Sequence, residues 1–169
     1  LIVTTNPVTE IDIVTESYNL ETSDLDDLMA TDNFQPNLPV DFSKVFVSAQ
    51  ALNAFGTYDI TNFRVTVFDS DDNELFVGNT DLDEPDDNSG TNDFEELVWN
   101  YNDPSEPSEN HNGKGIYSVR VAAIDQQGNE FYVDKPIQMD AYGIYSYTPQ
   151  TEQSVAVGGD VSYLSLIHI

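Results

Sequence analysis

Hydrophobic and polar residues alternate along most of the middle of the chain, with the period of two that is typical of β-strands with one buried face. In the clearest case Phe63, Val65 and Val67 fall on one side of the predicted strand, and Arg64 and Thr66 fall on the other. The pattern predicts at least four strands of this kind, which cover residues 43–50, 60–69, 94–101 and 115–123. In the first of them Val45, Val47 and Ala49 form the apolar side and alternate with Phe46, Ser48 and Gln50.

Two segments share one turn sequence. Val67 to Val77 and Ala123 to Val133 both place an Asp, an Asn-Glu pair and an apolar triplet at the same offsets. Asp, Asn and Gly form local side-chain hydrogen bonds and tolerate positive φ, so we expect each segment to be a strand, a short turn and a strand. Shared turn chemistry explains the similarity without a duplication.

Many short strands with hardly any helix predict an all-β fold, and specifically a β-sandwich with partial flanking modules. We expect the complete sandwich to occupy residues 41–140. Residues 1–40 are interpreted as the end of a preceding module or a linker, in which Ser23 to Met29 favour one helical turn. The alternation begins again at residues 141–163, which we interpret as the truncated start of a following β module.

The last six residues, Leu164 to Ile169, form an abrupt apolar end. One set of codons for them, CTGTCTCTTATACACATC, resembles the end sequence of a transposon used to build sequencing libraries. We therefore interpret residues 164–169 as adapter sequence, with a genuine apolar strand as the alternative. His168 is given no functional role.

Two short motifs carry a family resemblance. Phe55-Gly-Thr-Tyr-Asp-Ile60 precedes one predicted strand, and Ser154 to Tyr163 contains a Gly-Gly pair before another. Across about residues 41–163 these motifs resemble tandem immunoglobulin-like repeats of prokaryotic surface and secreted proteins. The resemblance implies an immunoglobulin- or fibronectin III-like sandwich, an extracellular or cell-surface location, and neighbouring modules of the same chain as partners.

A second resemblance involves a Trp-containing strand and a Gly-x-Tyr strand. Trp99 to Asp103 and Gly115-Ile-Tyr117 are similar to parts of the immunoglobulin-like domain of flagellar hook-capping proteins, although the Trp-Asp-Gly sequence expected there is absent. This resemblance implies a hook-assembly scaffold as an alternative function. The Gly-x-Tyr sequence also fits the tyrosine corner of β-sandwiches, with a plain core Tyr as the alternative.

The chain is strongly acidic, with 31 Asp and Glu against 5 Lys and Arg and a formal net charge of -26. This balance argues against nucleic acid and against anionic membrane surfaces, both of which attract basic residues. No apolar run approaches the roughly 20 residues that span a bilayer. We interpret the charge as adaptation to a salt-rich habitat, where repulsion is screened.

Calcium is the cofactor that the acids suggest. Ca²⁺ takes six to eight oxygen ligands, which a loop at one end of a sandwich can supply from carboxylates and carbonyl groups. A solvated acidic loop is the alternative. The candidate ligands are Asp81, Asp83, Asp86, Asp87 and Asp93.

Catalytic motifs are missing from the sequence. The chain has no Cys, no His pair with zinc spacing and no glycine-rich phosphate loop. His111, the one His considered for a hydrolytic triad, has no Ser in a nucleophile elbow near it. We therefore predict that the chain is not an enzyme but a structural or adhesive repeat, which acts as a spacer or as an interaction module.

The alternative is a carbohydrate- or calcium-binding module attached to an extracellular enzyme. Tyr142, Tyr145 and Tyr147 suit stacking on a sugar ring, although on a strand they divide between the two faces and core or inter-module packing is the favoured interpretation. The partner would then be a glycan or a surface protein.

Overall fold

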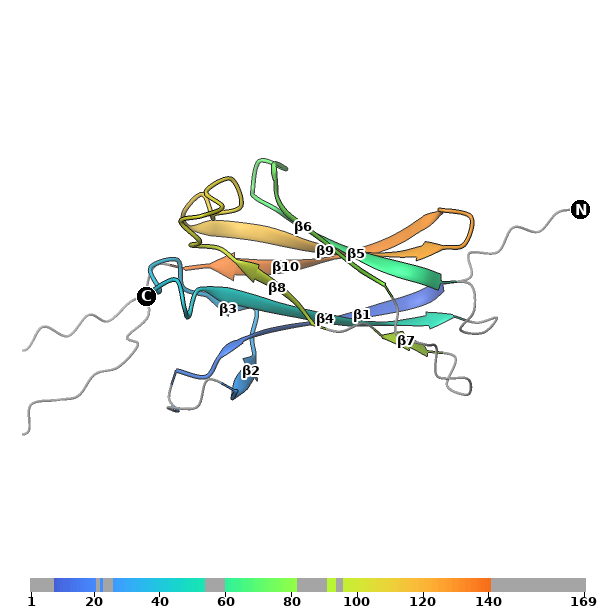
Figure 1. Ribbon diagram of the computed structural model, residues 1–169, viewed down its shortest axis with the longest axis horizontal. Helices are drawn as coiled ribbons and strands as arrows, with labels where there is room; N and C mark the ends of the chain where they lie inside the picture. The colour runs from blue at the N-terminus through green and yellow to red at the C-terminus, as the bar shows by residue number, and fades with distance from the viewer. Residues whose placement is uncertain are drawn as a thin grey trace, which may run out of the picture.

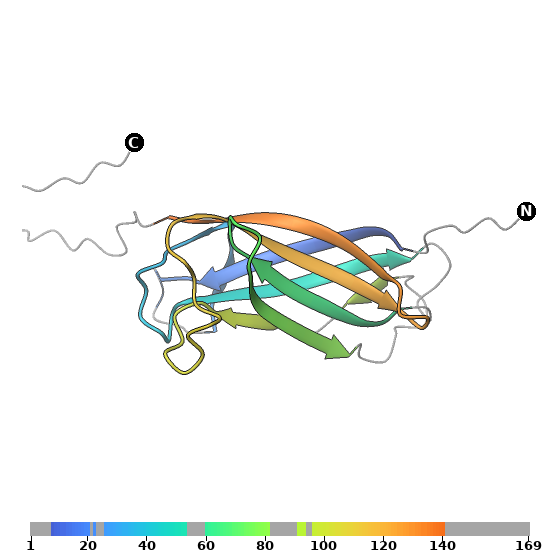
Figure 2. The same cartoon turned by 90° about the horizontal axis from the view of Figure 1, so that it is seen from above.

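The computed structural model describes residues 8–20, 22, 26–53, 60–81, 91–93 and 96–140. These residues form ten β-strands in two sheets that pack face to face (Figures 1 and 2). They contain no helix, and hence none long and apolar enough to cross a membrane. The all-β sandwich predicted from the alternation is confirmed.

The first sheet is antiparallel and is built around the long central strand β4. Strand β1 pairs with one edge of β4, and two short strands share its other edge. In spatial order the strands are β2 (Leu28–Ala30), β1 (Val8–Tyr18), β4 (Lys44–Asn53), and then β7 (Thr91–Asp93) and β8 (Leu97–Asn100).

The second sheet holds five strands, with β9 and β5 in the middle. All its neighbours are antiparallel except β3 and β10, which run parallel. The spatial order is β3 (Asn33–Phe34), β10 (Glu130–Met139), β9 (Gly115–Asp125), β5 (Ile60–Phe68) and β6 (Glu74–Asp81). The chain crosses between the sheets after β2, β3, β4, β6 and β8.

The core lies between the sheets and contains the alternate residues that the sequence predicts. Phe63, Val65 and Val67 of β5 are fully buried, and so is Trp99 of β8. Phe46 differs from the prediction, which placed it on the polar side of its strand. It is buried on the outer face of the first sheet, because the Tyr18 ring packs edge-on against it with the ring centroids 5.0 Å apart.

The sandwich begins earlier than the predicted boundary at residue 41. Strand β1 pairs with β4 from Val8 opposite Asn53 to Glu16 opposite Phe46, and Phe34 of β3 is part of the core. Residues 1–40 therefore include three strands of the sandwich.

The predicted helical turn at residues 23–29 is wrong at its C-terminal half. Leu28 and Met29 belong to β2, where they pair with Tyr18 and Ser17 of β1. Pairing with the preceding strand β1 overrides the local helical spacing there. Residues 23–25, the predicted following module at 141–163 and the interpreted adapter at 164–169 lie outside the described residues.

The chain enters and leaves the sandwich at opposite ends of its long axis. Figures 1 and 2 show β1 starting at one end and β10 finishing at the other.

Polar contacts close the edge of the sandwich where β1 and β10 come together. Lys135 Nζ lies 2.9 Å from Asp32 Oδ1 and donates to the carbonyl of Ile13 at 3.1 Å. Thr15, fully buried, donates to the carbonyl of Thr31 at 2.8 Å.

Candidate functional site

Of the five acids predicted to hold calcium, two lie within the described residues, and these two belong to different sheets. Asp81 is the last residue of β6 in the second sheet, and Asp93 is the last residue of β7 in the first. Asp83, Asp86 and Asp87 lie outside the described residues. Within the described part, no group of three or more His, Cys, Asp or Glu side chains is placed to hold a metal ion. Calcium binding by this loop remains a prediction.

The two segments with the shared sequence fold into the same hairpin turn. Asp69 Oδ1 accepts the backbone N–H groups of Asp71 and Asn73, each at 2.9 Å, and Asn73 Nδ2 donates to Asp69 Oδ2 at 2.9 Å. Asp125 makes the same three bonds with the residues two and four positions later, at 2.7 to 2.9 Å. The prediction of two strand–turn–strand units with common turn chemistry is confirmed.

These turn carboxylates have a lowered pKa. Hydrogen bonds from Asn73 lower the pKa of Asp69, and hydrogen bonds from Asn129 lower the pKa of Asp125. Asp69 also accepts a bond from Asn112 Nδ2 at 2.6 Å, which joins its turn to the loop before β9. A carboxylate held charged in this way is a weak proton acceptor, so these groups are better suited to bracing turns than to general base chemistry.

Tyr117, the second residue after Gly115, anchors the loop before β9. Its hydroxyl donates to the carbonyl of Gly113 at 2.8 Å, four residues earlier, and accepts the N–H of Asn112 at 2.9 Å. This is the geometry of a tyrosine corner, so that interpretation of the Gly-x-Tyr sequence is confirmed. The Tyr117 ring packs in the core beside Trp99, with the centroids 6.0 Å apart.

His111 connects two loops at the same end of the sandwich. Its Nδ1 accepts the N–H of Gly113 at 2.8 Å, and its Nε2 lies 3.0 Å from the carbonyl oxygen of Pro36. These partners assign the neutral tautomer with its proton on Nε2. Because both ring nitrogens are hydrogen-bonded to backbone groups, the His111 ring holds the two loops together.

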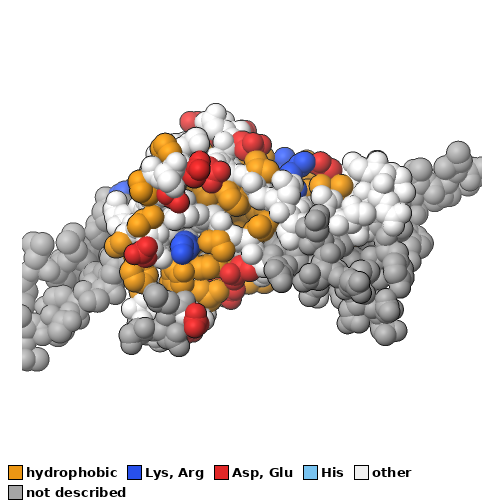
Figure 3. Space-filling model, in the orientation of Figure 1, with side chains coloured by type: hydrophobic (Ala, Val, Ile, Leu, Met, Phe, Trp, Pro, Cys, Tyr) orange, Lys and Arg blue, Asp and Glu red, His pale blue; other side chains and the backbone are white. Residues whose placement is uncertain are grey.

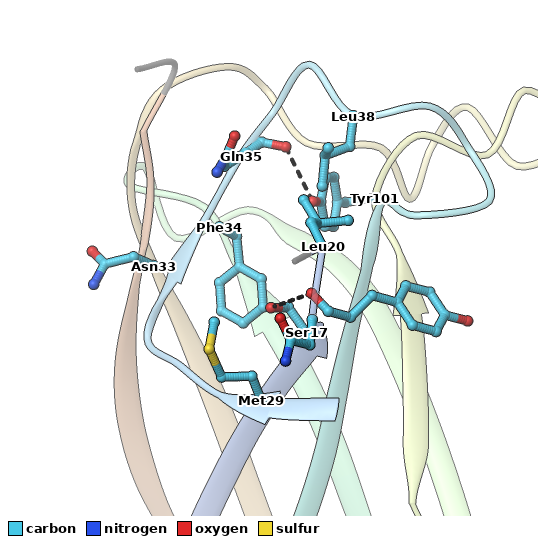
Figure 4. Close-up of a pocket in the computed structure, with 10 residues that line it drawn as sticks. Ser17, Leu20, Met29, Asn33, Phe34, Gln35, Leu38 and Tyr101 are labelled. Carbon is cyan, nitrogen blue, oxygen red and sulfur yellow. Dashed lines mark hydrogen bonds between the residues drawn. The ribbon is translucent and has the colours of Figure 1, made fainter. Parts of the chain in front are cut away.

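A pocket of about 270 Å³ opens at the same end of the sandwich as His111, beside the segment that runs from the end of β1 through β2 to β3 (Figure 4). The figure shows the side chains of Phe34, Leu20 and Tyr101 turned toward one another, while the Asn33 amide points away. The Tyr101 hydroxyl donates to the Gln35 carbonyl at 3.1 Å, which fixes one wall. The lining is uncharged and comprises Ser17, Tyr18, Asn19, Leu20, Met29, Asn33, Phe34, Gln35, Leu38 and Tyr101.

The pattern of hydrophobic and polar residues does not predict this pocket. Its lining comes almost entirely from a segment interpreted as a linker or preceding module. The signal that was present is the recurrence of Leu20, Met29, Phe34 and Leu38 in a stretch that is otherwise polar, which is unusual for a solvated linker.

The outer face of the second sheet carries a stack of aromatic and charged side chains. The Arg120 guanidinium lies 4.1 Å from the centroid of the Tyr132 ring and 5.0 Å from that of Phe68. It also forms two hydrogen bonds with the Asp134 carboxylate, at 2.7 and 2.9 Å. Charge on this face is largely neutralised, because Arg64 pairs with Glu130 as well.

No protein-family model matches this sequence, and neither does any curated protein.

Proposed function

We propose that the chain is a non-catalytic structural module of an acidic secreted or cell-surface protein, in which it works as a spacer between neighbouring modules. The observation that carries this proposal is the exit of the chain at the end of the long axis opposite to its start (Figures 1 and 2). A module connected in this way adds its full length to a row of modules, and a pulling force runs along its strands.

The strand arrangement supports the immunoglobulin-like part of the proposal. Strands β1, β4 and β8 face β5, β9 and β10, which corresponds to strands A, B and E facing C, F and G in an immunoglobulin sandwich. The corner formed by Tyr117 stands at the start of the strand that corresponds to F. Location outside the cell follows from the resemblance and is part of the proposal.

The pairing of β1 with β4 suits resistance to force. Their hydrogen bonds run perpendicular to the strands, so a pull on the two chain ends loads many of them together. A pull that opens strand pairs from one end loads the bonds one after another. The first geometry needs more force than the second.

Single-molecule force spectroscopy tests the proposal on the full chain, placed between marker domains. Pulling by the two ends should give one unfolding event that lengthens the chain by roughly 400 Å for the residues from Val8 to Asp140. The control keeps the N-terminal handle and moves the other handle from the C-terminus to Gln127→Cys. A single attachment site of this kind is possible because the chain has no Cys. Gln127 lies in the exposed β9–β10 turn, at the end where β1 starts, so this pull peels strands apart (Figure 1). An equal or lower force for the end-to-end pull would contradict the spacer role.

The pocket favours a second candidate function, the binding of a small uncharged ligand such as one sugar ring. Aromatic side chains together with polar residues in the lining suit such a ligand. Neutral mono- and disaccharides would be titrated against the full chain by calorimetry. Met29→Trp, which puts a larger side chain into the pocket lining, should abolish any heat of binding, and Val133→Trp at an exposed position of β10 should not.

A further inference from the structure

The outer face of the second sheet is a broad exposed surface, formed by the side chains of β5, β6, β9 and β10 that alternate with the core residues. Figure 2 looks down on this sheet and shows no described segment across the middle of the four strands. Large apolar or aromatic side chains are exposed on it: Ile116 at 64%, Tyr132 at 56% and Val77 at 39%. The face therefore offers contact area to a partner.

Arg120 is held in one position in the middle of this face. Its guanidinium contacts the rings of Phe68 on β5 and Tyr132 on β10, the strands on either side of its own. Its two hydrogen bonds to Asp134 fix it further. Tyr and Arg are among the residues that contribute most to protein interfaces, and side chains ordered in advance lose less entropy on binding.

The same face carries almost no net charge. Both Arg of the sequence lie on it, and each is paired with an acid, Arg64 with Glu130 and Arg120 with Asp134. Among its described side chains the one further acid is Glu74, which lies beside Phe68. This balance contrasts with the net charge of -26 for the whole chain.

The outer face of the first sheet is more acidic. Lys44 is its one base among the described side chains, against four acids. Burial and the neighbouring Glu16 carboxylate raise the pKa of Glu96, so like charges lie close together there. The four acids are Glu10, Asp12 and Glu16 of β1 and Glu96 before β8.

Charge favours a second copy of this chain as the partner on the second sheet. Two strongly acidic molecules repel each other, and the repulsion is smallest when they meet through their least charged surfaces. A basic partner would be attracted to the acids of the first sheet instead. Two twisted sheets of the same hand also pack well face to face.

The size of the face fits a weak dimer. Four strands about 4.8 Å apart, with about seven residues of about 3.3 Å each, span roughly 19 by 23 Å, or about 440 Å² before side-chain relief is added. Stable complexes bury about 800 Å² on each partner. We therefore expect a dissociation constant on the order of 10–100 μM.

We propose that two copies of the chain associate face to face through the outer faces of their second sheets, around a two-fold axis. The proposal is independent of the spacer role, because it uses one side of the sandwich and not the positions of the chain ends.

Analytical ultracentrifugation of the full chain measures the association. In about 1 M NaCl, where the Debye length is about 3 Å, monomer and dimer should coexist at about 10–100 μM protein. In about 0.1 M NaCl the dissociation constant should be at least about threefold higher, because repulsion between the copies is less screened. A chain that stays monomeric up to about 500 μM in about 1 M NaCl would overturn the proposal.

Variants assign the contact to one sheet. Tyr132→Glu removes an exposed ring and adds an unpaired charge, so it should raise the dissociation constant more than about tenfold. The matched control is Val14→Glu, which adds the same charge at a 43% exposed position on the outer face of the first sheet. The control should stay within about twofold of the unaltered chain. Equal weakening by the two variants would overturn the assignment to the second sheet.

Spin labels locate the contact without changing its aromatic and charged side chains. The chain has no Cys, so Asn79→Cys on the second sheet and Gln50→Cys on the first each take one label, both at exposed positions. Packed sheets lie about 10 Å apart, so across the dimer the Gln50 labels should be about 20 Å further apart than the Asn79 labels. Double electron–electron resonance measures both distances. A shorter distance for the Gln50 pair would overturn the proposal.

Discussion

At the scale of single residues, the hydroxyl of Tyr117 ties the loop before β9 to the core. The change Tyr117→Phe leaves the Gly113 carbonyl and the Asn112 N–H without this partner while the ring still packs beside Trp99. We expect a loss of about 1–3 kcal/mol in the free energy of unfolding, measured by urea denaturation. Tyr132→Phe is the control, because that ring is 56% exposed. A loss within about 0.5 kcal/mol for Tyr117→Phe would contradict the role of the corner.

The turn carboxylates predict a pH dependence. The folded state lowers the pKa of Asp69 and Asp125, so their charge stabilises the fold above the unfolded value near 3.8, and this stabilisation is lost as pH falls through the lower folded pKa. The double change Asp69→Asn and Asp125→Asn should lower the urea midpoint at pH 6 and flatten its decline toward pH 2.5. Asp12→Asn, on an exposed strand position, should leave the decline unchanged. A double variant that declines as steeply as the unaltered chain would refute the assignment.

Which side chains are buried was largely readable from the sequence. Alternation identified the inward residues of β5 and β9, because both strands have one face toward the core and one toward solvent. Phe46 was assigned to the wrong side in terms of burial, since its neighbour Tyr18 comes from a strand that the sequence reading placed in a different module. Contacts between segments distant in the chain leave no local pattern.

At the scale of elements, the two hairpin turns can be compared position by position. Gly128 has φ of +82° and Asp72, at the same place in the other turn, has φ of +61°. A Cβ atom on Gly128 would meet nothing within 4 Å, so any cost of a side chain there is conformational. We expect Gly128→Ala to cost about 1–2 kcal/mol and Gly128→Asp to cost less, because Asp tolerates this region. Urea denaturation measures both, and an equal or larger cost for Gly128→Asp would show that the turns are not equivalent.

Strands β4, β5, β8 and β9 lie in segments that the alternation predicts, whereas the short strands β2 and β3 were not predicted. Strands β4, β5 and β9 combine strict alternation with β-branched residues, which is sufficient to identify them. Strands β2 and β3 have three and two residues, and only their partners β1 and β10 make them strands. The pocket was missed for the same reason, since it forms where these short elements meet β1.

At the scale of the whole molecule, negative charge greatly exceeds the positive charge available to balance it. Among the described residues, Arg64 pairs with Glu130, Arg120 with Asp134 and Lys135 with Asp32, whereas the sequence contains 31 acids and 5 basic residues. The other acids repel one another across the surface, and this repulsion opposes the compact state. Packing between the sheets and backbone pairing within each sheet must therefore stabilise the sandwich against the repulsion between its own charges.

Salt should consequently stabilise the protein, because the Debye length falls from about 10 Å at 0.1 M to about 3 Å at 1 M. We expect the melting temperature to rise by several degrees over this range of NaCl, measured by circular dichroism. Calcium distinguishes general screening from binding at a site. At equal ionic strength, CaCl₂ should raise the melting temperature more than MgCl₂ only if the acids from Asp81 to Asp93 bind Ca²⁺. A ligand that binds only the folded state adds stability that grows with the logarithm of the ligand concentration. Asp86→Asn with Asp87→Asn should then remove the difference between the two cations and keep the effect of NaCl. A melting temperature that does not respond to NaCl would refute the interpretation of the charge as adaptation to salt.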